Sequence, residues 1–568
     1  MGEEEGRPGS IELDEIHSSK GESTVPSFPD TGEEEDLEKD FRDPNTFPYI
    51  LLSLWLNTSI CAVDGTIIST TMNEIASIFQ EASKVTWVAT AYMLTTCAVQ
   101  PLYGKTSDLL GRKKCLLFAE VVFIVGLVMC GAARTIEELI VARAICGVGG
   151  SGLGAMCNII LSDLAPLSQR SIYWGWGSVI WGFSQSVGGP LGGLLLNWFG
   201  VRGLFVVQIP FCLFSLSLTV KYIHDLSNQT QGTWRDIDFA GSFCLITGIS
   251  AFIFLCSSSG DVTDDSAVSL FKVGCFLITV LSVSGFIYVE KNVAAKSILP
   301  AEVLKGSLGV ISFIYGLASM LSYVGLFVVP LYLQLVWGVS VAGSGGYIMY
   351  AVISTSIGSF GSGWLLRKYG APDKDATLLN SGMMLIGSTL INTLGFFVMF
   401  KNILEIKPAF EGVKSPSPDQ KFWFLLGFAI MGLSAGFQSV SVMLYTVAKV
   451  GRKGQASSTS VTFLFRSLGN VLSVSISLSV FVASLKGKLK SYFQGQQSDL
   501  YRKLLKENAF LRSGEVPSDQ LKDLLQVFKS AIVKAFWPSV VCCFLSVTFA
   551  GVLFVMIRRS RRFAGLSA

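Results

Sequence analysis

Long apolar runs recur along almost the whole chain, and they restrict its possible folds more than any other feature. A membrane-spanning helix needs about 20 predominantly apolar residues, and runs of this kind follow one another from Phe47 onward. Inside a bilayer every backbone polar group needs an internal partner, so such runs must form helices. We therefore predict an all-α polytopic membrane protein with fourteen spans. They lie near residues 47–70, 85–105, 115–133, 137–160, 173–195, 204–222, 239–257, 270–289, 309–335, 343–366, 378–400, 422–447, 459–484 and 537–557.

The composition agrees with a membrane protein and argues against several functional classes. Hydrophobic residues make up 50% of the 568 positions and charged residues only 15%, whereas soluble proteins carry roughly 25% charged residues. The twelve cysteines form no CxxC pair and there are only two histidines. We therefore expect small buried thiols rather than a metal site or a histidine-based catalytic triad. We expect a protein that is not an enzyme, that uses no cofactor and that binds no nucleic acid.

Charge separates an N-terminal leader from the rest of the chain. Residues 1–46 hold fifteen Asp or Glu and four Lys or Arg, a net charge of −11, while the remaining residues carry +14. The few apolar side chains of this segment cannot offset the entropy that would be lost on ordering it. We therefore expect an acidic, disordered leader on the cytoplasmic side.

Lys and Arg residues in the short loops predict the orientation. An even number of spans places both termini on one side, and a cytoplasmic placement puts twenty Lys or Arg in the cytoplasmic loops and tail against seven opposite. The positive-inside rule favours this arrangement, with 558–568 as a basic cytoplasmic tail. The long non-cytoplasmic loop 485–536 has the pattern of two amphipathic helices, and Ser518 is the expected N-cap of the second. Its apolar face consists of Leu521, Leu524, Leu525, Phe528 and Ile532.

A compact pattern of glycine, aspartate and basic residues occupies the loop between the second and third spans. Glycines allow a tight turn and close helix approach, and Asp108 can accept amides at a helix N-terminus or pair with Arg112. A weaker copy after the tenth span indicates an internal repeat. The two segments read Gly104-Lys-Thr-Ser-Asp108-Leu-Leu-Gly111-Arg112-Lys113-Lys114 and Gly363-Trp-Leu-Leu-Arg367-Lys368-Tyr-Gly370.

Two further glycine-rich segments lie inside predicted spans. The fourth span contains a GxGxxG pattern, but it lies in a membrane helix rather than after a strand, which favours close helix packing over nucleotide binding. In the fifth span, Pro190 among glycines should weaken and bend the helix. The segments read Arg143-Ala-Ile-Cys-Gly147-Val-Gly149-Gly150-Ser-Gly152 and Gly188-Gly189-Pro190-Leu-Gly192-Gly193.

These three segments resemble motifs A, B and C of the major facilitator superfamily, and the span count resembles its fourteen-helix drug:proton antiporter branch. Within that branch, Asp64-Gly65-Thr66 and the acidic leader make the chain most similar to fungal vacuolar basic amino acid transporters. The resemblance implies two six-helix bundles, 47–224 and 309–557, separated by two inserted helices and linkers in 225–308. It implies alternating access around a midplane site, with motif A acting in gating and motif C in the rocking interface.

Charged residues inside the spans are few, and in a membrane they indicate function by default. Asp64 and Arg143 each lie about six residues, or about 9 Å, from the same side of the membrane, so they can pair or share a water-filled cavity. Two roles remain open for this pair. Desolvation opposes the carboxylate charge and the cation favours it, so protonation of Asp64 can switch the pair, or the pair can be purely structural.

Other polar residues of the spans are weaker candidates. Glu120, in the third span, is either a second proton-coupling or substrate residue or a side chain that reaches the cytoplasmic interface. Tyr332 and Gln334 follow Pro330 in the ninth span and are candidates for lining a polar cavity. Four further charges lie near span ends, where snorkelling or capping is the expected role. They are Asp163, Asp238, Glu290 and Arg466.

The leading functional hypothesis is proton-coupled transport of the basic amino acids lysine, arginine and histidine from cytosol to vacuole, by a monomer in the vacuolar membrane. Its partners are cationic small molecules, protons and the lipid bilayer, with the proton gradient as the driving force. A plasma-membrane multidrug:proton antiporter is the alternative. A sensor without transport activity, whose leader recruits a partner, is a third possibility. The chain has Thr70-Thr71-Met72-Asn73 where the drug-export branch usually has Ala-Leu-Pro, which argues against a generic drug substrate without identifying an amino acid.

Overall fold

The computed structural model describes residues 46–79, 84–165, 167–223, 239–257, 266–292, 306–370, 374–408, 416–450, 455–493, 499–506 and 518–564, together with Leu511 and Val516. One compact unit spans Pro44–Ala568 and contains all of them. Apart from Thr46, the predicted acidic leader lies outside the described residues, and so does Asp238.

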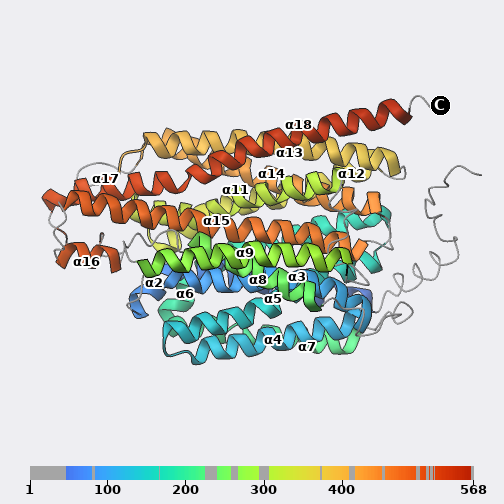
Figure 1. The fold of residues 1–568 in the computed structure, drawn as a ribbon, viewed down its shortest axis with the longest axis horizontal. Coiled ribbons are helices and arrows are strands. Elements are labelled where there is room, and N and C mark those ends of the chain that lie inside the picture. Colours follow the sequence, from blue (N-terminus) through green and yellow to red (C-terminus); the bar gives the residue numbers. More distant parts are fainter. Residues whose placement is uncertain are drawn as a thin grey trace, which may run out of the picture. The chain divides into compact units, whose positions relative to one another are not determined.

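Every regular element among these residues is a helix, as predicted (Figure 1). Fourteen of the described helices coincide with the predicted spans. Their bounds are α2 (Phe47–Phe79), α3 (Val85–Leu110), α4 (Arg112–Ala132), α5 (Ile136–Leu164), α6 (Leu167–Val206), α7 (Ile209–Tyr222), α8 (Phe239–Ser257), α9 (Ser266–Asn292), α11 (Ser307–Leu335), α12 (Val341–Gly370), α13 (Lys374–Glu405), α14 (Pro418–Val450), α15 (Gln455–Tyr492) and α18 (Trp537–Ala564). Two shorter helices, α16 (Asp499–Lys506) and α17 (Ser518–Ala535), lie between α15 and α18.

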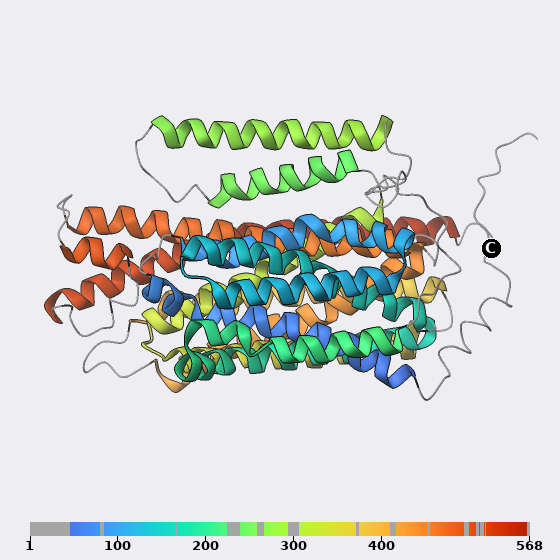
Figure 2. The same cartoon turned by 90° about the horizontal axis from the view of Figure 1, so that it is seen from below.

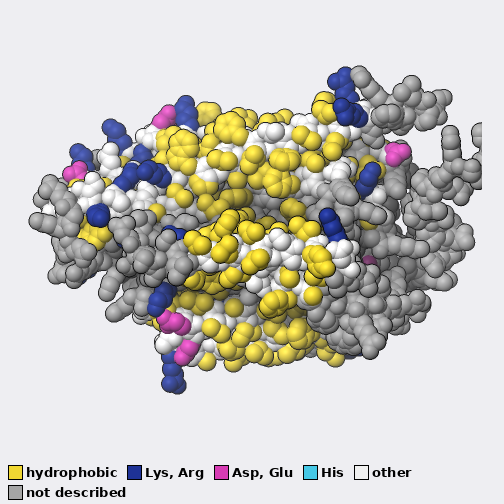
Figure 3. All heavy atoms as spheres, in the orientation of Figure 1, with side chains coloured by type: hydrophobic (Ala, Val, Ile, Leu, Met, Phe, Trp, Pro, Cys, Tyr) yellow, Lys and Arg dark blue, Asp and Glu magenta, His cyan; other side chains and the backbone are white. Residues whose placement is uncertain are grey.

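The surface of the helices has the character of a membrane protein. On the face in Figure 3, hydrophobic side chains cover the middle of the helices, while Lys, Arg, Asp and Glu gather toward the two ends. Large apolar side chains such as Phe118, Phe214 and Leu281 are more than half exposed. Within the described part of the chain, ten helical stretches are sufficiently long and apolar to cross a membrane. The protein is therefore a multi-pass membrane protein.

Two large clusters of buried apolar side chains hold the helices together. One is built mainly from α2–α7 and the other from α11–α18. Between the two sets, α6 packs along α12 and α3 packs along α15. Helices α8 and α9 pack on each other at one side, and α8 contacts α3 and α15 (Figure 2).

Two helices, α15 and α6, differ in extent from the sequence prediction. Helix α15 continues through Tyr492, so the predicted loop 485–536 begins several residues later. Helix α6 continues through Pro190, and its backbone leaves helical geometry at Gly200, where φ is 67° and ψ is −172°. Glycine tolerates this left-handed φ because it has no Cβ.

The second amphipathic helix of the loop forms as predicted and packs on the protein. Leu524, Leu525, Phe528 and Ile532 of α17 are fully buried, and the helix contacts α15 and α11. This packing adds a face of the long loop to the apolar cluster of α11–α18. The side chain of Ser518, the predicted N-cap, lies outside the described residues.

Candidate functional site

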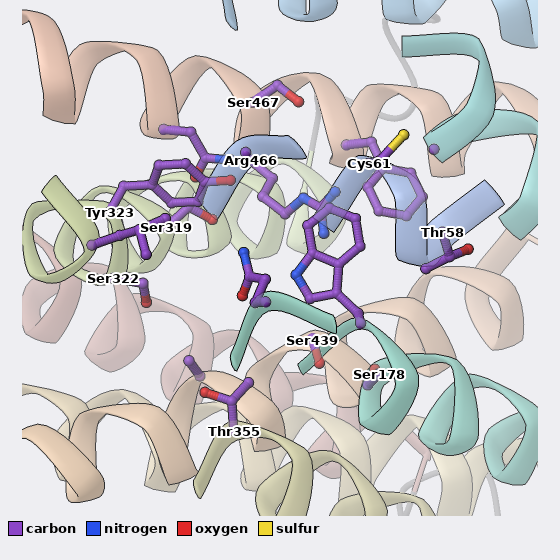
Figure 4. A pocket seen from close by; sticks show the side chains of 18 of the residues that line it. Thr58, Cys61, Ser178, Ser319, Ser322, Tyr323, Thr355, Ser439, Arg466 and Ser467 are labelled. Atoms are coloured by element: carbon purple, nitrogen blue, oxygen red, sulfur yellow. The ribbon is translucent and has the colours of Figure 1, made fainter. Parts of the chain in front are cut away.

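A cavity of about 350 Å³ lies among eight helices. It is lined by α2, α3, α5 and α6 from the first half of the chain and by α11, α12, α14 and α15 from the second. This volume suits a small molecule, since ligand pockets usually enclose about 300–1,000 Å³. Figure 4 shows that hydroxyl groups from both halves surround the space, among them Thr58, Ser178, Ser319, Thr355 and Ser439.

The buried ion pair between Asp64 and Arg143 lies directly beside this cavity. Arg143 Nη1 donates to both carboxylate oxygens of Asp64, at 2.8 and 2.9 Å. Both side chains are almost completely buried, with 0% exposure for Asp64 and 1% for Arg143. The Arg143 guanidinium lies over the ring of Tyr92, 4.4 Å from its centroid. Arg143 and Tyr92 line the cavity and Asp64 does not, so the carboxylate lies behind the arginine.

The motif B glycines allow α5 to approach its neighbours closely enough to place Arg143. A Cβ on Gly149 would lie only 2.5 Å from the backbone nitrogen of Phe123 in α4. On the other side, Thr95 Oγ1 of α3 donates to the carbonyl of Ala144 at 2.8 Å. The GxGxxG pattern therefore serves helix packing in the described structure, as the sequence indicated.

Glu120 does not line the cavity, and it does not reach an interface as the alternative interpretation held. Its side chain is 2% exposed and Oε1 accepts hydrogen bonds from three side chains of α2 and α7. These donors are Asn57 Nδ2 at 2.8 Å, Thr219 Oγ1 at 2.8 Å and Ser215 Oγ at 3.2 Å. Its other oxygen, Oε2, is buried and accepts no hydrogen bond from the described part of the chain. The prediction that Glu120 contacts the substrate in this cavity is therefore wrong, because its side chain does not line the cavity.

Side chains of motif A link the junction of α3 and α4 to α5 and α7 by hydrogen bonds. Gly111, at φ 96°, ends α3 and permits the sharp entry into α4. Arg112 Nε donates to Asp163 Oδ2 at 2.9 Å and Arg112 Nη1 to Ser107 Oγ at 2.6 Å, while Lys113 Nζ donates to the carbonyl of Val220 at 2.8 Å. Asp163 is thus a partner of motif A, which its position near a span end did not indicate. Gly104 is buried within α3, and the predicted contacts of the Asp108 side chain lie outside the described residues.

Motif C lies where α6 meets α2 and α12. A Cβ on Gly188 would lie 3.0 Å from Thr66 Cβ, and one on Gly189 would lie 3.2 Å from Gly345 Cα. Gly192 likewise faces Ile67 of α2, and Gly193 is half-buried. These glycines join two helices of the first half to one of the second, because any side chain there would separate the backbones.

Tyr332 and Gln334 do not line the cavity, and that prediction is wrong. Tyr332 is fully buried in the apolar cluster, its ring centroid 5.9 Å from that of Trp337 and 6.3 Å from that of Phe424. Gln334 Nε2 donates to Ser344 Oγ at 3.0 Å. Tyr332 thus packs among aromatic rings, and the hydrogen bond of Gln334 joins α11 to α12.

The prediction for Arg466 is also wrong, because it lines the cavity rather than snorkelling to an interface. The available signal was its depth, about two turns inside the predicted span 459–484. The neighbouring Ser467 Oγ donates to Gln100 Oε1 at 2.6 Å and links α15 to α3 beside the cavity. Gln100, Asn158 and Asn470 also line it. Nothing in the sequence distinguishes these three residues from the many other polar residues of the spans, so their place in the cavity could not be predicted.

The side chains that line the cavity are suited to binding a ligand rather than to a chemical reaction. Its lining combines aromatic rings, hydroxyls, amides and two guanidinium groups. Among the residues described, no group of three or more His, Cys, Asp or Glu side chains is placed to hold a metal ion. The arrangement therefore suits reversible recognition of a small polar molecule.

Comparisons with known proteins agree with this fold. Residues 54–474 match the family described as Major Facilitator Superfamily. The chain is 32% identical to Vacuolar basic amino acid transporter 1 of Saccharomyces cerevisiae, covering 90% of this chain and 93% of that protein. It is 30% identical to Multidrug resistance protein fnx1 of Schizosaccharomyces pombe, covering 86% and 88%. A solved bacterial homologue of the human lysosomal transporter Spinster, in an inward-facing and occupied conformation, has the same fold, with a TM-score of 0.53 at 18% identity over 90% of this chain and 97% of that one.

Proposed function

Because this chain belongs to the Major Facilitator Superfamily, and is thus a multi-pass membrane transporter, we propose that it moves basic amino acids from the cytosol into the vacuole in exchange for protons. The expected substrates are lysine, arginine and histidine. Two relatives from Saccharomyces cerevisiae support this proposal, since both are named vacuolar basic amino acid transporters and are 32% and 31% identical to the chain.

The observation that carries the proposal is a cavity lined by both halves of the chain, with the Asp64–Arg143 pair at its wall. Alternating access requires a site that each half can expose in turn. A single chain supplies all eight lining helices, which supports transport by a monomer.

The ion pair supplies a physical reason for antiport. When Asp64 is ionised, its charge compensates Arg143 at the cavity wall. When Asp64 takes up a proton, Arg143 is left uncompensated and the cavity becomes more positive by one charge. A cationic substrate then binds less well, and by linkage a bound cation disfavours protonation to the same extent. Proton and cation therefore exclude each other, which is the requirement for exchanging one for the other.

The test is uptake of labelled lysine, arginine and histidine into vacuolar vesicles with and without the protein. We expect accumulation that needs the protein and is lost when an ionophore collapses the proton gradient. Accumulation that persists without the gradient would contradict proton coupling, and absence of protein-dependent uptake would contradict the substrate assignment.

A second candidate is a multidrug:proton antiporter in the plasma membrane. The 30% identity to Multidrug resistance protein fnx1 favours it, and the same cavity and ion pair serve its mechanism. A fluorescently tagged full chain located in the vacuolar membrane would support the first function. A plasma-membrane location together with drug sensitivity of a deletion strain would support the second.

A further inference from the structure

The cavity is positively charged on its walls. None of the described residues that line it is Asp or Glu, whereas two are arginines, Arg143 and Arg466. Asp64 compensates Arg143 from behind. Arg466 has no carboxylate within ion-pair distance in the described part of the structure. Such a wall repels a purely cationic ligand and attracts an anionic group.

Arg466 reaches the cavity as a cation that has no ion-pair partner among the described residues. It extends from α15 toward the middle of the space, on the side that also holds Ser319, Ser322 and Tyr323 of α11 (Figure 4). Its guanidinium lies over the ring of Phe463, 4.6 Å from the centroid. Its Nε is buried and has no hydrogen-bond partner among the residues that the structure describes. An uncompensated charge at membrane depth is costly, so a bound anion would stabilise this arrangement.

The geometry of a guanidinium selects the kind of anion. Its planar fork of N–H donors matches the two oxygens of a carboxylate, and charge-assisted hydrogen bonds of this type are stronger than neutral ones. We propose that Arg466 binds the carboxylate of the transported substrate, so that the cavity selects amino acids over the corresponding amines. This inference rests on the proposed function, because it takes the cavity as the substrate site.

The cationic end of a basic amino acid then needs another partner, and the lining offers aromatic rings. Aromatic faces attract ammonium and guanidinium groups, most strongly where water is excluded. Arg143 over Tyr92 already shows one such contact in this cavity. The aromatic residues that line the cavity include Trp55, Tyr92, Trp174, Trp181, Tyr315 and Tyr323. The substrate would thus be held by its carboxylate at Arg466 and by its side chain on these rings.

The test measures ligand binding to the purified full-length protein by ligand-induced thermal stabilisation. The ligands are three matched acid and amine pairs: lysine with cadaverine, arginine with agmatine, and leucine with isoamylamine. Loss of a charge-assisted hydrogen bond weakens binding roughly 10- to 100-fold. We expect the wild type to prefer each acid by roughly this factor, and Arg466→Gln to bind the acids more weakly and the amines more strongly.

Two further variants separate recognition from folding. Arg466→Lys keeps the charge without the fork and should retain part of the preference. Arg202→Gln makes the same change as Arg466→Gln at an exposed position of α6 and should leave the preference unchanged. A purely structural role of Arg466 would weaken acids and amines together, and that result would overturn the proposal.

The outcome does not depend on which amino acid is transported. Three outcomes would overturn carboxylate recognition. The wild type could bind acids and amines equally, it could bind none of the three acids, or the preference for acids could survive in Arg466→Gln. The vesicle uptake of lysine, arginine and histidine decides the proposed function separately. A wild type that binds leucine over isoamylamine through Arg466 but takes up no basic amino acid would retain this inference and overturn the substrate assignment.

Discussion

Arg143 and Asp64 are 79 positions apart in the sequence, and one nitrogen of the guanidinium, Nη1, lies within hydrogen-bond distance of both carboxylate oxygens. The pair is buried between α2 and α5, and only its cationic member lines the central cavity. This asymmetry means that a proton on the hidden carboxylate changes the charge that a substrate meets.

Neutralising both Asp64 and Arg143 distinguishes a role of this pair in proton coupling from a purely structural role. Asp64→Asn leaves Arg143 buried without its counter-charge, which costs about 3–5 kcal/mol of stability. Asp64→Asn with Arg143→Gln removes both charges and should recover the thermal stability of the purified protein. We expect this double variant still to lack substrate accumulation driven by an imposed pH gradient.

The control for this pair is Asp419→Asn, the same change at an exposed position of α14, which should leave accumulation and stability intact. Gradient-driven accumulation by the double variant would show that the pair only holds the helices together.

Glu120 is expected to stabilise the contact of α2, α4 and α7 rather than to carry protons. Glu120→Ala leaves buried donors unsatisfied, at about 1–3 kcal/mol for each one that finds no other partner. Glu120→Gln keeps an acceptor for the same donors and should retain both thermal stability and transport. An uptake defect in Glu120→Gln at normal stability and abundance would instead assign Glu120 to coupling. Glu405→Ala, at an exposed side chain, is the control for the stability measurement.

Arg112 should affect the rate of transport more than the affinity for substrate. Its hydrogen bonds to Asp163 and Ser107 fix the α3–α4 junction, and it does not line the cavity. Arg112→Gln is therefore expected to lower the maximal uptake rate several-fold with little change in the half-saturating substrate concentration. Arg558→Gln, at an exposed position near the end of α18, should change neither. A rise in the half-saturating concentration alone would contradict a gating role.

Close packing of α5 against α4 should make Gly149 intolerant of even one methyl group. In Gly149→Ala the new Cβ would meet the backbone of Phe123 at 2.5–2.7 Å, and overpacking of this kind costs about 1–3 kcal/mol. We expect a lower melting temperature of the purified protein. Gly154→Ala, on the same helix with no atom within 4 Å of the added Cβ, should melt like the wild type. Equal melting temperatures of the two variants would refute the packing explanation of motif B.

The helices were predictable because the signal for them is local. A membrane helix is recognised from the hydropathy of about 20 consecutive residues, and all fourteen predicted spans coincide with described helices. The face of α17 was predictable for a related reason, since its Leu524, Leu525, Phe528 and Ile532 alternate with polar residues at helical spacing. The equal depth of Asp64 and Arg143 allowed either a direct pair or a shared water-filled cavity, and the structure shows the direct pair.

The direction in which each side chain points was much less predictable. Tyr332, Gln334 and Arg466 were each assigned to the wrong surroundings although the helices that carry them were correct. Lipid is as apolar as the protein interior, so the sequence of a membrane helix hardly distinguishes its buried face from its lipid-facing one. Glu120 shows the same limit, because its three donors come from α2 and α7 and are brought together only by packing.

The sequence by itself thus determined that this chain crosses the membrane many times, where its helices lie, and which glycine and charge motifs it shares with a transporter family. These are properties of consecutive residues and of their transfer from water to lipid. Only the tertiary structure decided which polar groups meet in the central cavity. It placed Arg466 there with no carboxylate within ion-pair distance among the described residues, and Asp64 behind Arg143, because the rotation of each helix about its own axis is fixed by its neighbours.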